Sequence, residues 1–140
     1  MKYLLDTCVI SEAIKARPDR RVAEWLRTCV ASDVSISVLT LGEIQKGISK
    51  LSDEKRIRKL QHWLDRDIQD RFAGRILSID SEVARTWGEI QGESERSGRP
   101  IPTIDGLLAA TALAHRLCLV TRNVDHFLDL DLKVLDLWMD

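Results

Sequence analysis

Short apolar runs that alternate with helical segments constrain the fold of this 140-residue chain more than any other feature. The first run, Lys2–Asp6, ends abruptly in an acid, as is typical of a strand buried on both faces of a parallel sheet. The other predicted strands span 34–37, 75–79, 118–121 and 133–135. Apolar residues at helical spacing predict helices over 20–30, 38–51, 54–72, 81–97 and 103–117.

Strands that alternate with helices favour right-handed crossovers and an open sheet covered on both sides. We therefore predict an α/β fold, with a central, mostly parallel sheet of about five strands flanked by helices on both faces. The length suits one domain over residues 1–140. The turn formers of segment 94–102 predict a loop between two helices and no domain boundary.

The charge balance excludes a general attraction to polyanions. The chain carries 21 Lys and Arg against 22 Asp and Glu, so affinity for nucleic acid or membrane requires a local patch. No stretch approaches the roughly 20 apolar residues of a membrane span, and Asp6 interrupts any signal-peptide core. We expect a cytoplasmic protein whose cysteines, Cys8, Cys29 and Cys118, are buried free thiols.

Oxygen-bearing side chains follow two of the predicted strands. Asp6 comes directly after the first strand, and Asn123 and Asp125 follow the strand over 118–121. Open α/β sheets bind ligands outside the carboxyl ends of their strands, near the point where the strand order reverses. These residues are therefore candidates for the chemistry of the protein.

Two predicted helices carry further acids. Glu43 falls at the edge of the apolar stripe of helix 38–51, beside Thr40 and Gly47. Asp105 lies in the first turn of the most apolar helix, for which Thr103 is the expected N-cap. Taken alone, Asp105 is equally well explained as a first-turn acid that interacts with the helix dipole.

The acids come from separate elements that can meet at one end of the sheet. Clustered carboxylates repel one another, so one of them carries a proton unless a cation is present. Oxygen ligands without Cys or His suit Mg²⁺, or alternatively Mn²⁺. The three histidines form no zinc-binding pattern, and the sequence therefore predicts a hard divalent cation.

Four stretches together resemble the PIN-domain endoribonucleases, and more closely the VapC-type toxins of bacterial toxin–antitoxin pairs, including their FitB-like branch. The likeness covers nearly the whole chain. The stretches are Leu-Leu-Asp6-Thr-Cys-Val-Ile-Ser-Glu, Ser-Val-Leu-Thr-Leu-Gly-Glu43-Ile-Gln-Lys-Gly-Ile, Ile-Pro-Thr-Ile-Asp105-Gly-Leu-Leu-Ala-Ala-Thr-Ala and Leu-Val-Thr-Arg-Asn123-Val-Asp-His-Phe127.

The resemblance implies a role for each residue of the site. Asp6 and Asp105 would bind the metal directly, and Glu43 would act at the metal directly or through water. Thr7 would support the first aspartate. Thr121 and Asn123 would complete the site.

Two positions depart from the family pattern. Relatives usually carry Asn where this chain has Cys8, so one polar contact near the metal is missing or supplied elsewhere. Many relatives carry an acid at the position of Asn123, which leaves the fourth acidic role open between Asn123 and Asp125.

The resemblance also implies an activity. The chain would be the toxin of a type II toxin–antitoxin system, a Mg²⁺-dependent endoribonuclease that hydrolyses RNA of the tRNA or rRNA class and inhibits translation. Glu43 or Asp125 would orient or deprotonate the attacking water. A cognate antitoxin would cover the active-site groove, two toxin chains would form a homodimer, and DNA would be contacted only through the antitoxin.

RNA that approaches an acidic pocket requires a basic rim. The candidates for phosphate contacts, each of which can equally be an ordinary solvated charge, are Lys15, Arg17, Arg20, Arg21, Lys46, Lys50, Arg99 and Arg122. Trp25, Leu26 and Trp63 are candidate anchors for a partner protein, with core packing as the alternative.

Two alternative classes remain at this point. An aspartate-based phosphatase or a receiver domain also places an Asp after the first strand, but the phosphatase needs a second acid where Cys8 stands. The receiver needs further acids near the first strand and a late Lys, and neither is clear. A catalytically inactive interaction module of the same fold is disfavoured by the presence of Asp6, Glu43 and Asp105.

Overall fold

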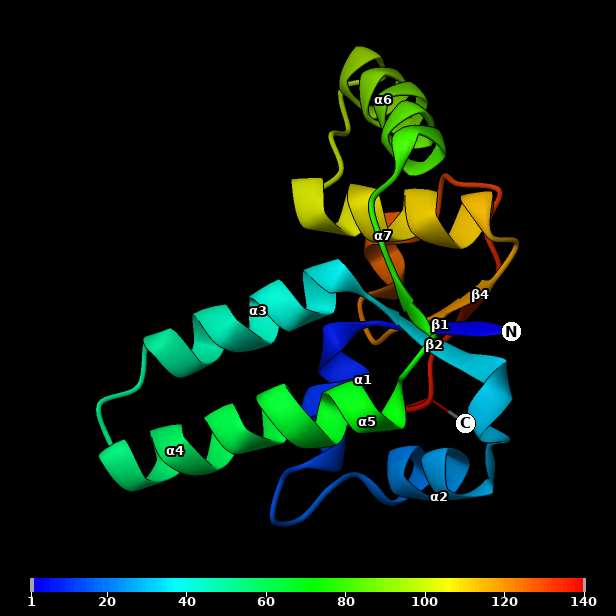
Figure 1. Cartoon of the computed structure of the whole chain (residues 1–140). Helices are drawn as coiled ribbons and strands as arrows, with labels where there is room; N and C mark the ends of the chain where they lie inside the picture. Colours follow the sequence, from blue (N-terminus) through cyan, green and yellow to red (C-terminus); the bar gives the residue numbers. More distant parts are fainter. Residues whose placement is uncertain (1, 140) are drawn as a thin grey trace.

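A computed structural model of the chain describes residues 2–139 and contains a five-stranded, all-parallel sheet. The strand order is β3-β2-β1-β4-β5 (Figure 1). The strands are β1 (Tyr3–Leu5), β2 (Val34–Ser37), β3 (Ile76–Leu77), β4 (Cys118–Val120) and β5 (Val134–Leu135). The predicted α/β fold with a parallel sheet of about five strands is confirmed.

The predicted helices are present with small shifts at their ends. They are α2 (Arg20–Thr28), α3 (Val38–Ser49), α4 (Glu54–His62), α6 (Ser81–Arg96) and α7 (Thr103–Ala114). The segment predicted as one helix over 54–72 is interrupted after α4 by η2 (Trp63–Ile68), a turn of π-helix, and continues as α5 (Gln69–Arg71). Short 3-10 turns occur at η1 (Ala31–Asp33) and η3 (Val124–Phe127).

One helix was not expected from the sequence, and one expectation about a helix start is wrong. The sequence analysis did not predict α1 (Thr7–Ala13), which begins directly after β1 because Asp6 caps it by accepting a hydrogen bond from the Thr7 amide. Thr103 is not an N-cap. It is the first residue of α7, Pro102 occupies the cap position, and no side chain caps this helix.

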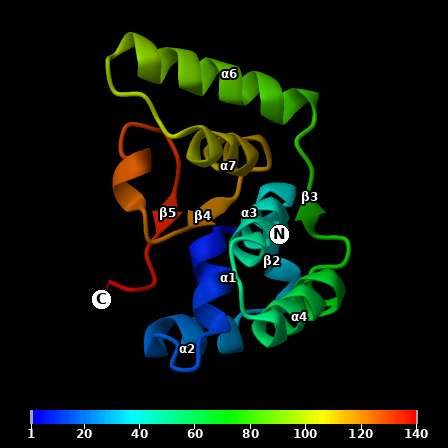
Figure 2. The same ribbon diagram turned by 90° about the vertical axis from the view of Figure 1, so that its left-hand side faces the viewer.

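Apolar clusters lie on both faces of the sheet, as the continuously apolar β1 predicts. Leu5 belongs to the cluster shared with α1, α2, α3 and η2, and its neighbour Leu4 belongs to the cluster shared with α7 and η3. Figures 1 and 2 show α7 next to the sheet and α6 outside α7. Successive side chains of a strand point to opposite faces, so two adjacent leucines anchor both layers.

The sheet reverses its order between β1 and β4. The chain runs outward from β1 to β2 and β3, then returns to place β4 on the other side of β1. Leu5 is in register with Val120, so the next residues, Asp6 and Thr121, emerge side by side at the carboxyl ends of the two strands. This reversal is where open α/β sheets bind their ligands.

Helices α3 and α4 lie side by side and extend away from the sheet (Figure 1). Their side chains Gln45 and Gln61 exchange two amide hydrogen bonds, of 3.1 and 2.8 Å.

The cysteines are free, but all three are only partly buried, so the prediction of buried thiols is wrong in degree. No helix among the described residues is long and apolar enough to cross a membrane.

Candidate metal and catalytic site

Asp6 is the centre of the site. Its carboxylate is only 4% exposed, and each oxygen accepts one hydrogen bond. The Thr7 amide donates to Oδ1 at 2.7 Å, and the Thr121 hydroxyl donates to Oδ2 at 2.7 Å. The two bonds fix the carboxylate at the end of β1 and leave lone pairs on both oxygens for a further partner.

Thr121, at the end of β4, links three parts of the site. Its fully buried hydroxyl donates a hydrogen bond to Asp6 and accepts a 3.0 Å hydrogen bond from the Asn123 amide. The Cys8 sulfur lies 3.8 Å from the same hydroxyl oxygen. Because the Thr121 proton is committed to Asp6, the Cys8 thiol is the donor of this weak contact.

The thiol keeps the proton that this contact requires. Burial, together with the negative charge of Asp6, raises the pKa of Cys8 to about 11. Cys8 is therefore a neutral thiol at physiological pH, with no role as a nucleophile or as a thiolate ligand. Cys8 thus makes a weak polar contact at the position where the family resemblance leads us to expect Asn.

Glu43 is held by α1. Ser37 caps α3 by accepting a hydrogen bond from the Leu39 amide, and this start places Glu43 on the second turn, half-buried. The Thr7 hydroxyl donates to Glu43 Oε1 at 2.6 Å and also lies 3.1 Å from the buried hydroxyl of Thr40. Thr7 therefore contacts both acids, Asp6 through its backbone and Glu43 through its side chain.

Asp105 reaches the site from α7, on the other face of the sheet. It is the third residue of that helix, and its side chain is 15% exposed. Its Oδ2 forms a hydrogen bond with the Nδ1 atom of His126 in η3. The sequence analysis did not predict any role for His126.

The electrostatics of the cluster are unfavourable without a cation. Burial raises the pKa of Asp6, and the negative charges of Asp105 and Glu43 raise it further, against the opposing hydrogen bonds from Thr121 and Thr7. No Lys or Arg forms an ion pair with these three acids in the part of the chain that the structure describes. The acids therefore share a local excess of negative charge.

The donor set fits a hard divalent cation, because it consists of carboxylate and hydroxyl oxygens. The carboxylates are not gathered tightly around a common point. Within residues 2–139, no group of three or more His, Cys, Asp or Glu side chains stands close enough together to hold a metal ion. Three acids that repel one another are expected to stand apart in this way when no cation lies between them.

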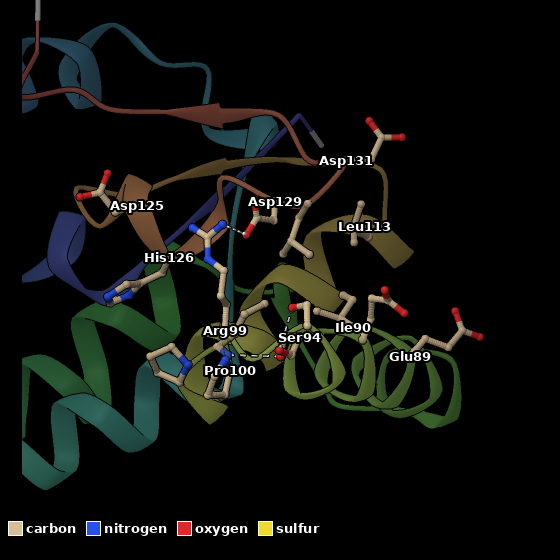
Figure 3. Close-up of a pocket in the computed structure, with 15 residues that line it drawn as sticks. Glu89, Ile90, Ser94, Arg99, Pro100, Leu113, Asp125, His126, Asp129 and Asp131 are labelled. Carbon is tan, nitrogen blue, oxygen red and sulfur yellow. Dashed lines mark hydrogen bonds and ion pairs between the residues drawn. The ribbon is translucent and has the colours of Figure 1, made fainter.

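Asn123 and Asp125, the two candidates for the fourth acidic role, are both exposed. Asn123 contributes its backbone amide to Thr121, as described above. Asp125 lines a cavity of about 810 Å³ between α6, the loop before α7 and η3 (Figure 3). No hydrogen bond or ion pair among the described residues joins Asp125 to Asp6, Glu43 or Asp105.

The candidate RNA contacts are all exposed, and several are already paired. Lys15 pairs with the buried Glu12 at 2.9 Å, Arg21 with Asp19, and Arg99 with Asp129 at 3.2 Å. The guanidinium of Arg122 lies 5.3 Å from the ring centre of Trp138. The remaining exposed candidates are Arg17, Arg20, Lys46 and Lys50.

The candidate partner anchors are partly buried in the core. Trp25, Leu26 and Trp63 pack against the cluster on the α1 face of the sheet, and the Trp25 ring meets Tyr3 edge to face. Leu26 and Trp63 also line a small cavity of about 160 Å³ beside η2. Core packing is thus a role of all three residues.

Sequence reasoning missed two residues of the site. Thr40 lies three residues before Glu43 on the same helix, and this spacing was the signal that Thr40 belongs near the site, where it contacts Thr7. His126 stood inside a motif quoted for its Asn and Asp, with nothing to indicate that it contacts Asp105. Both contacts depend on tertiary packing.

Comparisons with known proteins agree with this architecture. The family described as "PIN domain" matches residues 3–133. The chain is 37% identical to "Toxin FitB" of Neisseria gonorrhoeae, over 98% of this chain and 99% of that protein. It is 33% identical to "VapC ribonuclease Y4jK" of Sinorhizobium fredii, over 96% of each chain.

Solved structures extend the likeness to three dimensions. The crystal structure of FitAcB from Neisseria gonorrhoeae matches with a TM-score of 0.92 and 36% identity, over 99% of both chains. VapBC2 of Rickettsia felis, bound to a DNA fragment from its promoter, matches with a TM-score of 0.78 and 27% identity, over 96% of this chain and 97% of that one. The chain therefore belongs to the PIN domain family, and within it to the group of the FitB and VapC toxins.

Proposed function

We propose that this chain is a Mg²⁺-dependent endoribonuclease, with Mn²⁺ as an alternative ion, that serves as the toxin of a type II toxin–antitoxin pair. It cleaves RNA phosphodiester bonds and so inhibits translation. The observation that carries the proposal is the buried Asp6 carboxylate, placed where the strand order reverses and repelled by two further acids without a cationic partner. Several relatives bear the name ribonuclease.

Asp6, Asp105 and Glu43 are the residues that hold the ion in this proposal. When bound, a divalent ion offsets the negative charge that develops on the phosphate and lowers the pKa of a water molecule. The two hydrogen bonds on Asp6 favour its charged form, which is the form that binds a cation. Thr121 and Thr7 thus favour the ionised form of Asp6 that cation binding requires.

Glu43 is the better placed of the two candidates that orient or deprotonate the attacking water. The Thr7 hydroxyl fixes its Oε1 atom, and Thr7 also contacts Asp6, so Glu43 is tied to the centre of the site. Asp125 is exposed and lines the cavity, and no hydrogen bond among the described residues joins it to Asp6, Glu43 or Asp105. We therefore assign the water to Glu43 and leave Asp125 outside the reacting groups.

The RNA, of the tRNA or rRNA class, needs positive charge at the rim of this acidic site. Lys46 lies one turn after Glu43 on α3, and Arg122 directly follows Thr121. Lys15 and Arg17 follow the end of α1, whose first residue is Thr7. These four residues come from segments that also supply the site, so they are the preferred phosphate contacts, with Arg99 as a more distant candidate.

A cognate antitoxin is the proposed protein partner. The FitAcB, FitAB and VapBC structures are complexes, and three of those that match this chain include DNA. A net charge of −1 gives this chain no general attraction for DNA, so it reaches DNA only through the antitoxin. We further propose a homodimer of toxin chains, a single domain over 1–140 and a cytoplasmic location.

RNA cleavage by the purified protein tests the proposal. The protein is incubated with a pool of tRNA and rRNA in Mg²⁺ and in chelator, alongside Asp6→Asn and Asp105→Asn. Asp70→Asn, which alters an exposed acid after η2, is the matched control. We expect cleavage only by the wild type and the control in Mg²⁺. Cleavage that persists in chelator, or in either site variant, contradicts the proposed mechanism.

The same experiment separates the alternatives. Because the chain belongs to the PIN domain family, the phosphatase and receiver alternatives are set aside. A wild-type protein that binds its antitoxin but cleaves no RNA under any metal condition would instead favour the inactive interaction module.

A further inference from the structure

His126 makes a contact that the proposed function does not use. Its Nδ1 atom forms a hydrogen bond with Asp105 Oδ2, although the His126 side chain is 44% exposed and comes from a different element. An ionised carboxylate can only accept hydrogen bonds, so the Nδ1 atom carries the proton and donates it. The contact therefore also fixes the tautomer of the imidazole.

We propose that His126 is a positioning residue for Asp105, which it orients for cation binding. This inference rests on the proposed metal centre. Carboxylate ligands of metals are themselves hydrogen-bonded, and these outer partners fix the orientation of the ligand. A bond from His126 to Oδ2 restricts rotation of the Asp105 carboxylate and leaves Oδ1 available to the ion.

Asp105 has no other restraint of this kind. The start of α7 has no side-chain cap, because Pro102 occupies the cap position. No hydrogen bond other than that from His126 reaches the Asp105 carboxylate from the residues that the structure covers. The orientation of this acid thus depends on a single imidazole.

The backbone that carries His126 is well anchored. Phe127, the next residue, is almost fully buried in the cluster beneath α7, and the His126 amide donates to the Asn123 carbonyl at 3.2 Å. The Asn123 amide in turn donates to Thr121, which holds Asp6. One short segment, residues 121–126, therefore positions two of the three acids, one at each end.

His126 also borders the cavity of about 810 Å³ described above. It lines the cavity together with Asp125, and Figure 3 shows the two side chains projecting from η3 in different directions. Asp125 is the carboxylate of the pair, yet the imidazole is the side chain that contacts Asp105. The η3 turn therefore contributes to the site through His126, which donates a hydrogen bond to the proposed metal ligand Asp105.

A metal titration followed by thermal unfolding tests this role without measuring catalysis. The full chain is titrated with Mn²⁺ alone, and the midpoint of the rise in melting temperature is compared among variants. His126→Ala removes the donor. His126→Asn restores it, because the asparagine Nδ2 atom occupies the position of the histidine Nδ1 atom. His115→Ala, at the exposed end of α7, is the matched control.

We expect His126→Ala to require about 10-fold to 100-fold more Mn²⁺, the usual effect of removing an outer partner of a metal ligand. His126→Asn should recover most of that loss, and His115→Ala should match the wild type. The melting temperature without metal should change little, because nearly half of the His126 side chain is exposed.

Each alternative result has one meaning. A wild type whose melting temperature does not respond to Mn²⁺ overturns the proposed metal centre, and this inference with it. A normal wild-type response with an unchanged midpoint in His126→Ala overturns only the role of His126. A midpoint as weak in His126→Asn as in His126→Ala also overturns it, because donation to Asp105 would not then be the relevant property.

Discussion

Replacing Thr121 with valine tests whether the site is built around an ionised Asp6. The substitution keeps the shape of a fully buried side chain but removes the hydroxyl that donates to the Asp6 carboxylate at 2.7 Å. A hydrogen bond to a charged group contributes about 1.5–3 kcal/mol to stability. The Asn123 amide and the Cys8 thiol lose their acceptor as well, so the upper half of this range applies.

The loss translates into a measurable shift in the melting temperature. A chain of 140 residues has an unfolding entropy of about 0.3 kcal/mol/K near the midpoint. A loss of about 2–3 kcal/mol therefore lowers the melting temperature of the metal-free protein by about 7–10 °C. Thermal unfolding followed by circular dichroism in chelator measures this shift.

The pH dependence identifies the cause. Burial raises the pKa of Asp6 above its ordinary value, and the Thr121 bond opposes that rise. When the pKa of an acid is higher in the folded protein than in the unfolded protein, the acid stabilises the fold fully at pH values below its pKa in the unfolded protein. This stabilisation is lost as the pH rises through its pKa in the folded protein. Without the hydroxyl that loss is larger, so Thr121→Val should cost less at about pH 4, where mainly the pH-independent loss of the acceptor for the Asn123 amide remains, than at about pH 8, where the full amount is lost.

Two controls distinguish the charge from other effects of the substitution. Thr111→Val removes an equally buried hydroxyl that donates to the carbonyl of Leu107, which is uncharged, so its cost should be about 1 kcal/mol and independent of pH. Thr121→Ser keeps the hydroxyl and should show no added pH dependence. The reasoning is refuted if Thr121→Val costs the same at both pH values, or no more than Thr111→Val.

Two further predictions concern packing and metal linkage. A Cβ atom at Gly106 would lie 2.8 Å from the buried Gln91 side chain, so Gly106→Ala should lower the free energy of unfolding by about 1–3 kcal/mol. Gly92→Ala meets nothing within 4 Å and should raise it by about 0.4–1 kcal/mol, as urea unfolding can measure. Mg²⁺ should raise the melting temperature more at pH 8 than at pH 5, because Asp6 must be ionised to bind it. Asp6→Asn should abolish this rise; a rise that persists would contradict the assignment of Asp6.

The order of strands and helices, and the acids at the strand ends, could be predicted because both depend on local patterns. The run before Asp6 is apolar throughout, which requires burial on both faces and hence a parallel sheet with helices on each side. Parallel strands all end at the same edge, so Asp6 and the residues after β4 had to be neighbours if those strands paired. The pairing itself came from the structure.

Features that depend on few residues or on tertiary contacts were not predicted. Helix α1 has seven residues, too few to show an apolar period, and its only local signal was the capping position of Asp6. That residue was interpreted as a ligand alone. The π-helical turn of η2 leaves the apolar spacing of the segment nearly unchanged, since Leu64 and Ile68 are both buried as the helix prediction required.

The fourth position of the site shows most clearly where sequence reasoning ends. The choice lay between Asn123 and Asp125 because both carry oxygen, the element that a hard cation prefers. In a 3-10 turn, however, successive side chains differ in direction by about 120°, so the residue that faces the site depends on how the turn is anchored. The burial of Phe127 sets that anchor, and it directs His126 to Asp105. Asp125 lines the cavity together with His126, and no hydrogen bond among the described residues joins it to Asp105. Sequence reasoning that looks only for oxygen ligands of a cation overlooks His126, because the proposed role of its imidazole is to hold the metal ligand Asp105 in place.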